Sequence, residues 1–560
     1  MELAGYEFGE IVGQGGMATV YQGLQLSLRR KVAIKVLDEE LQAETDIREA
    51  FDREALIIAR LSHPNIIPVI DRGISAQGSP CFVMEYVDGV DLAKVMRDGQ
   101  LGLNRKLELL LQIARALAYA HRNAVVHRDI KPSNVIVDKE WHVRVVDFGI
   151  AMLYRDTHDK PDDQSAGLIM GTEAYMAPEI KNSASRATAL SDIYAFGVLA
   201  FELFTGVLPS RGLKPPSQFD SEVSSKIDRL VLECLAPDPD RRPQRAELIA
   251  ERLLLALSGA HIDQQRAAEA KEAIGQKSFA LLDVLAEKRD RATYLFLETK
   301  TQHRYVVKKL PANHGSLSQW RLIASKSLPQ WITVHGVSSN QSSSVVVTDY
   351  LPGGCLSERL LSPITVAQFI PWARQISCAL AQAHNQGLYH GSVNSESIFL
   401  DGQQRAFLTG TGGGASLELP SRIKGASFES HLWADVNACG ALFYQMLIGE
   451  MPRYHHQQLK VGDAFSRIPS ALQRLIQWML GKASELPADM SRDQLMLQAQ
   501  KQLEGIEQDL PTQVWQPKQR KVKPIEPATV EQKKWLLFLL LVLLFLVLMD
   551  VGVIALFYLQ

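Results

Sequence analysis

The hydrophobic positions follow two alternating periods through the first half of the chain. Residues 32–37 and 81–87 are short apolar runs rich in β-branched residues, which predict buried strands. Residues 108–123 place apolar side chains three and four positions apart, which predicts an amphipathic helix. Such segments alternate up to about residue 258, so this half is predicted to mix helix and sheet.

A second block, from residue 278 to 505, repeats the first in outline. The matching segments are 32–37 with 305–310, 81–89 with 345–354, 113–137 with 376–400 and 190–209 with 433–452. Because the order and approximate spacing persist, we interpret the repeat as duplication of a whole domain. The polar, Ala- and Glu-rich residues 259–277 between the blocks predict a helical connector.

The apolar pattern changes again near the C-terminus, where residues 535–558 contain a single charge, Asp550. At ~1.5 Å per residue, a helix of this length spans a hydrocarbon core of ~30 Å. We expect a transmembrane helix, a buried core helix being the alternative. Residues 506–534 form a basic, Pro-containing juxtamembrane linker, which predicts a single-pass membrane protein with its N-terminal region in the cytoplasm. We expect Asp550 to mark the far interface or to contact another transmembrane partner or a second copy of the chain.

Composition narrows the function classes. Hydrophobic residues make up 46% and charged residues 22%, as in globular proteins. The net charge of -2 argues against general binding of nucleic acid. The five cysteines are scattered without a CxxC pair, which excludes a cysteine-built zinc site and fits a reducing compartment. The N-terminus has no basic start before an apolar stretch, so we expect no signal peptide.

Candidate phosphate chemistry begins with Gly13, Gly15 and Gly16, which follow a strand-like segment. Glycines let a backbone turn approach phosphate oxygens, although a plain hairpin would look the same. Lys35 ends an apolar strand, and Glu54 lies nineteen residues later in a helical segment. An ion pair between them would hold Lys35 over the α- and β-phosphates of a nucleotide.

The segment 127–134, HRDIKPSN, is more specific. Asp129 would accept the proton of a substrate hydroxyl, Lys131 would neutralise the γ-phosphate, and Asn134 would bind a metal ion. Asp147 begins a DFG sequence after an apolar strand and would supply a carboxylate ligand for Mg²⁺.

With the APE sequence at 177–179, Asp192 and Arg242, these motifs make residues 6–258 resemble a eukaryotic-like protein kinase domain of the bacterial Ser/Thr type. The resemblance implies an α+β, two-lobed fold with ATP and Mg²⁺, or Mn²⁺ in its place, between the lobes. It implies Lys35, Glu54, Asp129 and Lys131 as catalytic residues, and Asn134 and Asp147 as metal ligands. The nucleotide-binding residues that it implies are Val12, Gly13, Gly15, Gly16, Val20, Ala33, Lys35, Met84, Glu85, Val87, Asn134 and Asp147.

Met84 resembles the gatekeeper of that family, and 85–87 the adenine-binding hinge. Ala18 departs from the family pattern by replacing the third glycine of the loop. In the activation segment, 147–179, we expect autophosphorylation at Thr157 or Ser165, whereas Thr172 would contact the catalytic loop.

The second block keeps the structural positions of the first but lacks its candidate catalytic and metal-binding residues. Ser392 replaces the catalytic Asp129, Ser397 replaces Asn134, and Gly410 replaces Asp147, while Lys308 keeps the strand lysine. Residues 278–505 therefore resemble a pseudokinase that binds proteins or regulates the first half. The alternative is a small-molecule phosphotransferase, suggested by the His-Gly pair that ends at Gly391.

The sequence thus predicts a Ser/Thr kinase, tail-anchored in a membrane and acting on itself and on cytoplasmic proteins. Its domains would be 6–258, 259–277, 278–505, 506–534 and 535–558. The alternatives are a catalytically silent scaffold in a membrane assembly and a kinase for small metabolites. The resemblance also implies phosphorylation between paired copies.

Overall fold

The computed structural model describes most of the chain up to Asp509. The residues it describes are 3–509 without 43, 100, 149–172, 181–186, 211–212, 263–266, 271–277, 289–290, 313–316, 327, 341–342, 361–362, 411–427, 456–457, 461 and 482–493. The chain divides into a unit Met1–Glu504 and a unit Gly505–Gln560.

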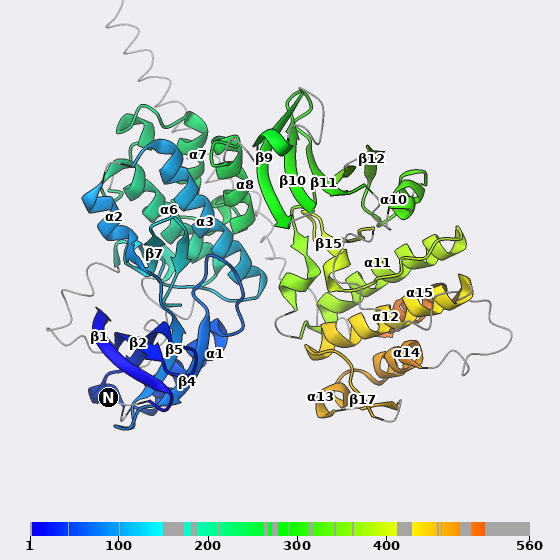
Figure 1. Cartoon of the computed structure of the whole chain (residues 1–560), viewed down its shortest axis with the longest axis horizontal. Helices are drawn as coiled ribbons and strands as arrows, with labels where there is room; N and C mark the ends of the chain where they lie inside the picture. Colours follow the sequence, from blue (N-terminus) through cyan, green and yellow to red (C-terminus); the bar gives the residue numbers. More distant parts are fainter. Residues whose placement is uncertain are drawn as a thin grey trace, which may run out of the picture. The chain divides into compact units, whose positions relative to one another are not determined.

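The first half begins with a five-stranded antiparallel sheet in the order β1-β2-β3-β5-β4. Its strands are β1 Tyr6–Gln14, β2 Ala18–Gln25, β3 Arg30–Leu37, β4 Val69–Ile74 and β5 Pro80–Glu85. The central strand β3 buries side chains on both faces, including Ile34 on one face and Ala33 on the other. Helix α1, Thr45–Ile58, packs on β4 and β5 (Figure 1). The predicted strands and helical segment are confirmed.

Helices form the rest of this half, around a small three-stranded sheet. The helices are α2 Leu92–Asp98, α3 Leu103–Arg122, α6 Ala189–Thr205, α7 Ser225–Cys234 and α8 Ala246–Leu257, and the strands are β6 Gly89–Asp91, β7 Val135–Asp138 and β8 Val143–Val145. The predicted amphipathic helix is α3, whose apolar face is buried against α6 and α8. Helix α6 starts with a capping box at Thr188 and ends at Gly206, whose φ of +74° suits glycine.

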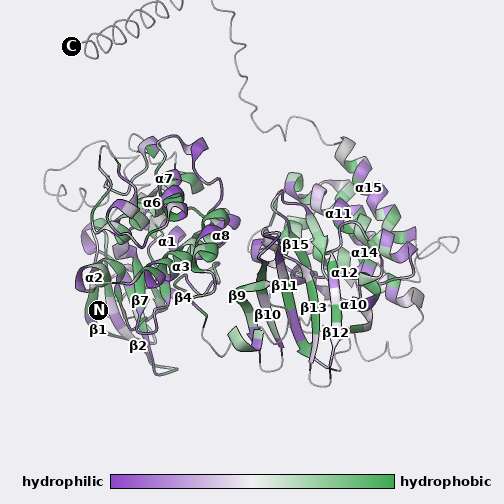
Figure 2. Cartoon of the chain, turned by 90° about the horizontal axis from the view of Figure 1, so that it is seen from above, coloured by the Kyte–Doolittle hydropathy of each residue, from purple (hydrophilic) through white to green (hydrophobic). Residues whose placement is uncertain are grey.

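The second half contains another five-stranded antiparallel sheet, in the order β12-β13-β11-β10-β9. Its strands are β9 Phe279–Lys288, β10 Arg291–Glu298, β11 Arg304–Pro311, β12 Val334–Ser339 and β13 Ser343–Asp349. Read from β9, this order is that of the first sheet. Helix α10, Leu317–Ala324, packs beside β12. The middle of strand β13 is hydrophobic and largely buried, and its hydrophobic residues are green in Figure 2.

Apart from β17 and β18, the remaining elements follow the order of the helical part of the first half. They are helices α11 Val366–Asn385, α12 Phe428–Ile448, α13 Asp463–Ser466, α14 Ser470–Leu480 and α15 Leu495–Asp509, with strands β14 Gly354–Cys355, β15 Ile398–Leu400, β16 Ala406–Leu408, β17 Tyr454–His455 and β18 Gln458–Leu459. Phe369 of α11 and Phe443 of α12 pack edge to face at 5.2 Å between ring centres. This pair joins the two helices that correspond to α3 and α6.

Two predicted boundaries differ from the structure in detail. Residues 259–262 of the predicted helical connector form turns, and residues 267–270 are helical. Helix α15 continues to Asp509, so the predicted boundary at 505 falls inside a helix. The predicted transmembrane segment lies outside the described residues, and none of the helices within them is long and apolar enough to cross a membrane.

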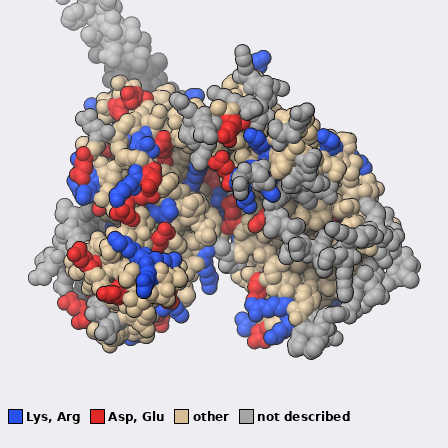
Figure 3. All heavy atoms as spheres, in the orientation of Figure 1, with Lys and Arg blue, Asp and Glu red and all other residues tan. Residues whose placement is uncertain are grey.

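Acidic and basic side chains are interspersed over the face of the first half drawn in Figure 3. Formal charges nearly cancel over the whole sequence, with 60 Lys and Arg against 62 Asp and Glu. The chain as a whole therefore carries no net positive charge that would attract a polyanion such as nucleic acid.

Candidate active site

An ion-pair network joins the sheet of the first half to its helical part. Lys35 Nζ on β3 lies 2.7 Å from Asp147 Oδ1 and 3.4 Å from Glu54 Oε1 on α1. Strand pairing fixes Lys35 opposite Phe82, and its ammonium lies over that ring at 5.6 Å. The structure thus brings together three residues that the sequence places 19 and 112 positions apart.

Burial sets the electrostatics of this network. It raises the pKa of Glu54 to about 7, although the Lys35 ammonium opposes that change. Burial by itself would lower the pKa of Lys35, but the carboxylates of Asp147 and Glu54 outweigh it and raise that pKa. Burial would raise the pKa of Asp147, but the Lys35 ammonium keeps that pKa below its ordinary value. The network therefore holds a charged lysine beside an ionised Asp147.

The loop before β7 is held in place by Asp192, which is almost fully buried on α6. Its carboxylate accepts hydrogen bonds of 2.7 Å from the backbone N–H groups of both His127 and Arg128, and its Oδ2 lies 2.8 Å from His121 Nε2. Arg128 has a φ of +71°, a left-handed conformation that costs free energy without such support. His127 also bonds the carbonyl of Val146 at 3.0 Å. The loop is thus fixed rigidly beside Asp147.

The side chains of Lys131 and Asn134 meet at the carboxylate of Asp129, at the end of this loop. Lys131 Nζ lies 2.7 Å from Asp129 Oδ2, and Asn134 Nδ2 donates to the same oxygen at 2.9 Å. Asn134 also donates to the Asp129 carbonyl at 2.8 Å, so its amide nitrogen is engaged and its amide oxygen is the atom it offers a cation. A short 3-10 turn, Pro132–Asn134, carries Asn134 to this position.

The glycine hairpin connects β1 to β2. Gly13 pairs with Val20, and the Gly15 N–H donates to the Ala18 carbonyl at 3.0 Å. A Cβ added at Gly16 would meet no atom within 4 Å, so the hairpin itself tolerates side chains there. The missing side chain leaves room for a phosphate to approach the backbone here.

The other predicted nucleotide-binding residues lie on the same sheet or just after it. Ala33 pairs with Met84, and both are buried; Val32 pairs with Glu85, the last residue of β5. Val12 is half exposed on β1, and Val87 follows β5. The structure therefore gathers the predicted set along β1, β2, β3 and the end of β5.

A second ion pair braces the helical part. The Arg242 guanidinium, whose side chain is fully buried, binds Glu179 through two parallel bonds of 2.6 and 2.8 Å. It also donates to the carbonyl groups of Leu190, Ala236 and Pro237.

The predicted phosphorylation sites cannot be placed in the structure. Gly149, Thr157, Ser165 and Thr172 of the predicted activation segment lie outside the described residues.

The second half reproduces the loop frame of the first atom for atom. The backbone N–H groups of His390 and Gly391 donate to Asp435 at 2.6 and 2.7 Å, and His390 Nε2 lies 2.8 Å from the carbonyl of Thr409. Gly391 has a φ of +77°, matching Arg128. Ser392 donates its N–H to His390 at 3.3 Å, as Asp129 does to His127. Ser392 therefore occupies the position that Asp129 has in the first half.

Trp320 occupies the space beside Lys308 in the second half, at the positions that correspond to the Lys35 network. This fully buried residue of α10 places its ring 5.1 Å from Lys308 Nζ, and no described carboxylate is paired with that ammonium. A Cβ added at Gly410 would lie 3.0 Å from two ring carbons of Trp320. The tryptophan thus fills the space that Glu54 and Asp147 use in the first half. The sequence gives no sign of this role, because Trp320 lies twelve residues after Lys308, whereas Glu54 lies nineteen after Lys35.

The first site fits a nucleotide with a divalent cation by its own chemistry. Asp147 supplies a carboxylate and Asn134 an amide oxygen, which are the hard ligands that Mg²⁺ prefers. Lys35 supplies a positive charge beside them. When bound, the cation would neutralise charge on the phosphates.

Kinase family models match a segment in each half of the chain. Residues 6–254 match the protein kinase domain family, and residues 274–412 match the protein tyrosine and serine/threonine kinase family. A probable serine/threonine-protein kinase of Streptomyces coelicolor is 38% identical over 260 residues, which cover 43% of this chain and 38% of that protein. Serine/threonine-protein kinase PknB of Mycolicibacterium smegmatis is 36% identical over 259 residues, covering 43% and 41%. The chain spans about two fifths of the length of these curated relatives.

Proposed function

We propose, from the premise that residues 6–254 form a protein kinase domain, that this chain transfers the γ-phosphate of ATP to Ser and Thr hydroxyls of proteins. One observation carries the proposal: Asp129, Lys131 and Asn134 converge on one point beside the network of Lys35 and Asp147. A domain that served only as a scaffold would have no chemical need for this complete set.

The chain's residues divide the work of phosphoryl transfer. Lys35 holds the phosphates, and Lys131 stabilises charge that develops on the transferred group. The substrate oxygen forms a bond to the γ-phosphorus as the bond from that phosphorus to the ADP oxygen breaks. Asp129 accepts the proton that the hydroxyl loses. The Asp192 hydrogen bonds keep the loop in position during this step.

The test is Mg²⁺-dependent transfer from labelled ATP to an added protein, followed by analysis of the phosphorylated amino acids. We expect label on Ser and Thr, and its loss in Asp147→Asn, which removes the metal carboxylate. Transfer to a small metabolite without transfer to protein would favour the metabolite kinase. Absence of all transfer from folded wild-type protein would favour the scaffold.

For residues 278–505 we propose a pseudokinase that regulates or scaffolds the first half. Support comes from Ser392 and Gly410 at the positions of the base and the metal carboxylate, and from the ring of Trp320 between Lys308 and Gly410. Comparing transfer by residues 1–265 with transfer by the full chain tests regulation, and equal rates would argue against it.

For residues 535–558 we propose a single membrane-spanning helix with the kinase on the cytoplasmic side. Its support is the apolar run with one charge and the adjacent basic linker. The chain should stay with membranes in alkaline carbonate and leave them in detergent. Release by carbonate would contradict the proposal. Partners at this helix, and self-association, are tested by crosslinking with Asp550→Leu as the comparison.

A further inference from the structure

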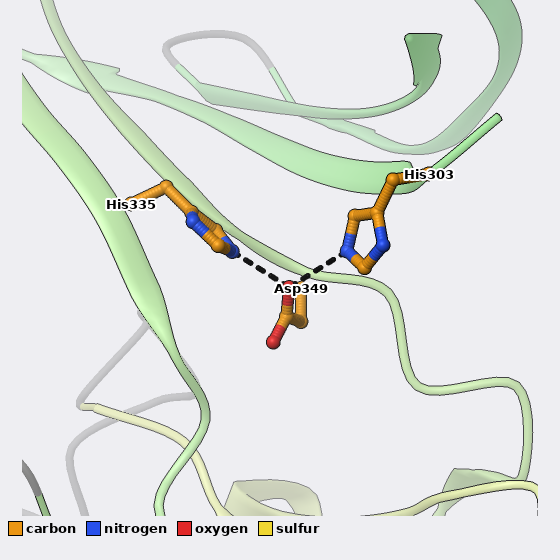
Figure 4. A group of neighbouring side chains, drawn as sticks. All are labelled: His303, His335 and Asp349. Atoms are coloured by element: carbon orange, nitrogen blue, oxygen red, sulfur yellow. Dashed lines mark hydrogen bonds and ion pairs between the residues drawn. The ribbon is translucent and has the colours of Figure 1, made fainter. Parts of the chain in front are cut away.

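Three side chains on one edge of the second sheet point toward a common centre (Figure 4). His303 precedes β11, His335 lies on β12, and Asp349 ends β13. His303 Nε2 lies 2.9 Å and His335 Nε2 2.6 Å from the same oxygen, Oδ1 of Asp349. One ligand atom from each residue lies within 4.8 Å of the others.

We propose that His303, His335 and Asp349 bind a Zn²⁺ ion. Two imidazole nitrogens and one carboxylate oxygen form a ligand set that Zn²⁺ accepts, with a water molecule in the fourth position. This proposal is independent of the kinase activity proposed for the first half.

The backbone geometry brings the two imidazoles to one carboxylate. Tyr305 pairs with Asp349 across β11 and β13, which places His303 near the end of β13. The pairing of β12 with β13 shifts by one residue between Val334 and Gly336, so His335 is the extra residue of a β-bulge. Bulges re-aim a side chain, and here the bulged residue is one of the three.

Neighbouring groups hold these side chains and leave the centre accessible. The Tyr305 ring lies 4.7 Å from the His303 ring and 5.0 Å from the His335 ring, between ring centres. Thr333 hydrogen-bonds the Asp349 carboxyl group, the kind of outer contact that orients a metal ligand. The His303 and His335 side chains are 50% and 37% exposed, so an ion can enter from solvent.

The first half lacks this ligand set at the matching positions. Strand pairing aligns Asp349 with Glu85, and the bulge at His335 corresponds to the one between Val69 and Asp71, where Ile70 packs in an apolar cluster. The site therefore belongs to the second half alone.

A second cluster, made of Asp138, Glu140 and His142, provides a matched control. Its Asp138 Oδ1 accepts backbone N–H bonds from Glu140 and His142 at 2.9 and 2.8 Å, so this oxygen already closes a turn. It also supplies one imidazole where the proposed site supplies two.

The experiment is calorimetric titration of the untagged full chain with ZnCl₂, repeated with CoCl₂ and visible absorption. We expect one Zn²⁺ per chain and the intense bands of four-coordinate Co²⁺. His303→Gln and His335→Gln should each weaken Zn²⁺ binding by ~10-fold or more and abolish the bands, while His142→Gln leaves both unchanged. Unaltered circular dichroism shows that each variant is folded. Binding that survives in both His303→Gln and His335→Gln, or that is lost in His142→Gln, would overturn the proposal.

Discussion

The ammonium nitrogen of Lys308 lies 5.1 Å from the centre of the Trp320 ring, where the corresponding Lys35 lies 3.4 Å from a Glu54 carboxylate oxygen. A ring face attracts a cation but carries no charge that could hold lysine against a phosphate. In the first half a carboxylate therefore orients the lysine ammonium toward the phosphate site. In the second half the indole ring only packs against the corresponding ammonium.

Restoring the metal carboxylate to the second half should destabilise it. In Gly410→Asp the new Cβ would lie 3.0 Å from the Trp320 ring, so the buried side chains must shift. We expect a loss of about 1–3 kcal/mol in the free energy of unfolding, from overpacking alone. The control is Gly336→Asp on β12, where an added Cβ meets no atom within 4 Å. Denaturant unfolding measures both, and equal losses would contradict the account.

The stability of the second half should depend on pH through Lys308. Burial lowers its pKa from an ordinary 10.5 to about 8 in the folded protein. Between these values the unfolded chain binds the proton and the folded chain does not, so stability rises as pH increases from about 8 toward 10.5. Below pH 8 both states are protonated, and the folded state carries the cost of a buried charge.

Lys308→Met should remove this rise, which is measured as the pH dependence of the unfolding free energy. Lys309→Met, one residue along β11, is the comparison and should retain it. An unchanged slope in Lys308→Met would show that the lysine does not titrate in this range.

Removing the buried guanidinium of Arg242 should cost about 3–5 kcal/mol of stability in Arg242→Ala, because Glu179 and three carbonyl groups lose their partner. Arg229→Ala removes an arginine whose side chain is 80% exposed and pairs with Glu233. Its expected cost is at most about 1 kcal/mol. Thermal unfolding of the two variants distinguishes them, and similar melting temperatures would be the contrary result.

The sequence was sufficient for the first site because its residues lie in contiguous motifs. The segment 127–134 carries the loop within eight residues, and Lys35 and Glu54 lie on a strand and a helix with clear apolar patterns. Local patterns fix such elements before any long-range contact is known. Asp192 was also found, although its hydrogen bonds to two backbone N–H groups required coordinates.

For the second half, the sequence showed which catalytic side chains are missing, but not which side chains fill the space they leave. The absence of an acid at 392 and 410 is visible in the sequence, but that Trp320 fills the resulting space depends on where α10 packs. The group of His303, His335 and Asp349 was missed for a similar reason. Its members lie 14 to 46 residues apart and meet only through strand register and a bulge.

The most direct test compares two matched substitutions in the full chain, Asp129→Asn and Ser392→Ala, for phosphate transfer from labelled ATP with Mg²⁺. Both residues follow the same backbone frame, with N–H bonds of 3.3 Å to His127 and His390. If the first half performs catalysis, Asp129→Asn should lose ~10²–10⁴-fold in rate, the contribution of a general base, and Ser392→Ala should keep the wild-type rate. Transfer that persists in Asp129→Asn, or that disappears in Ser392→Ala, would contradict the account.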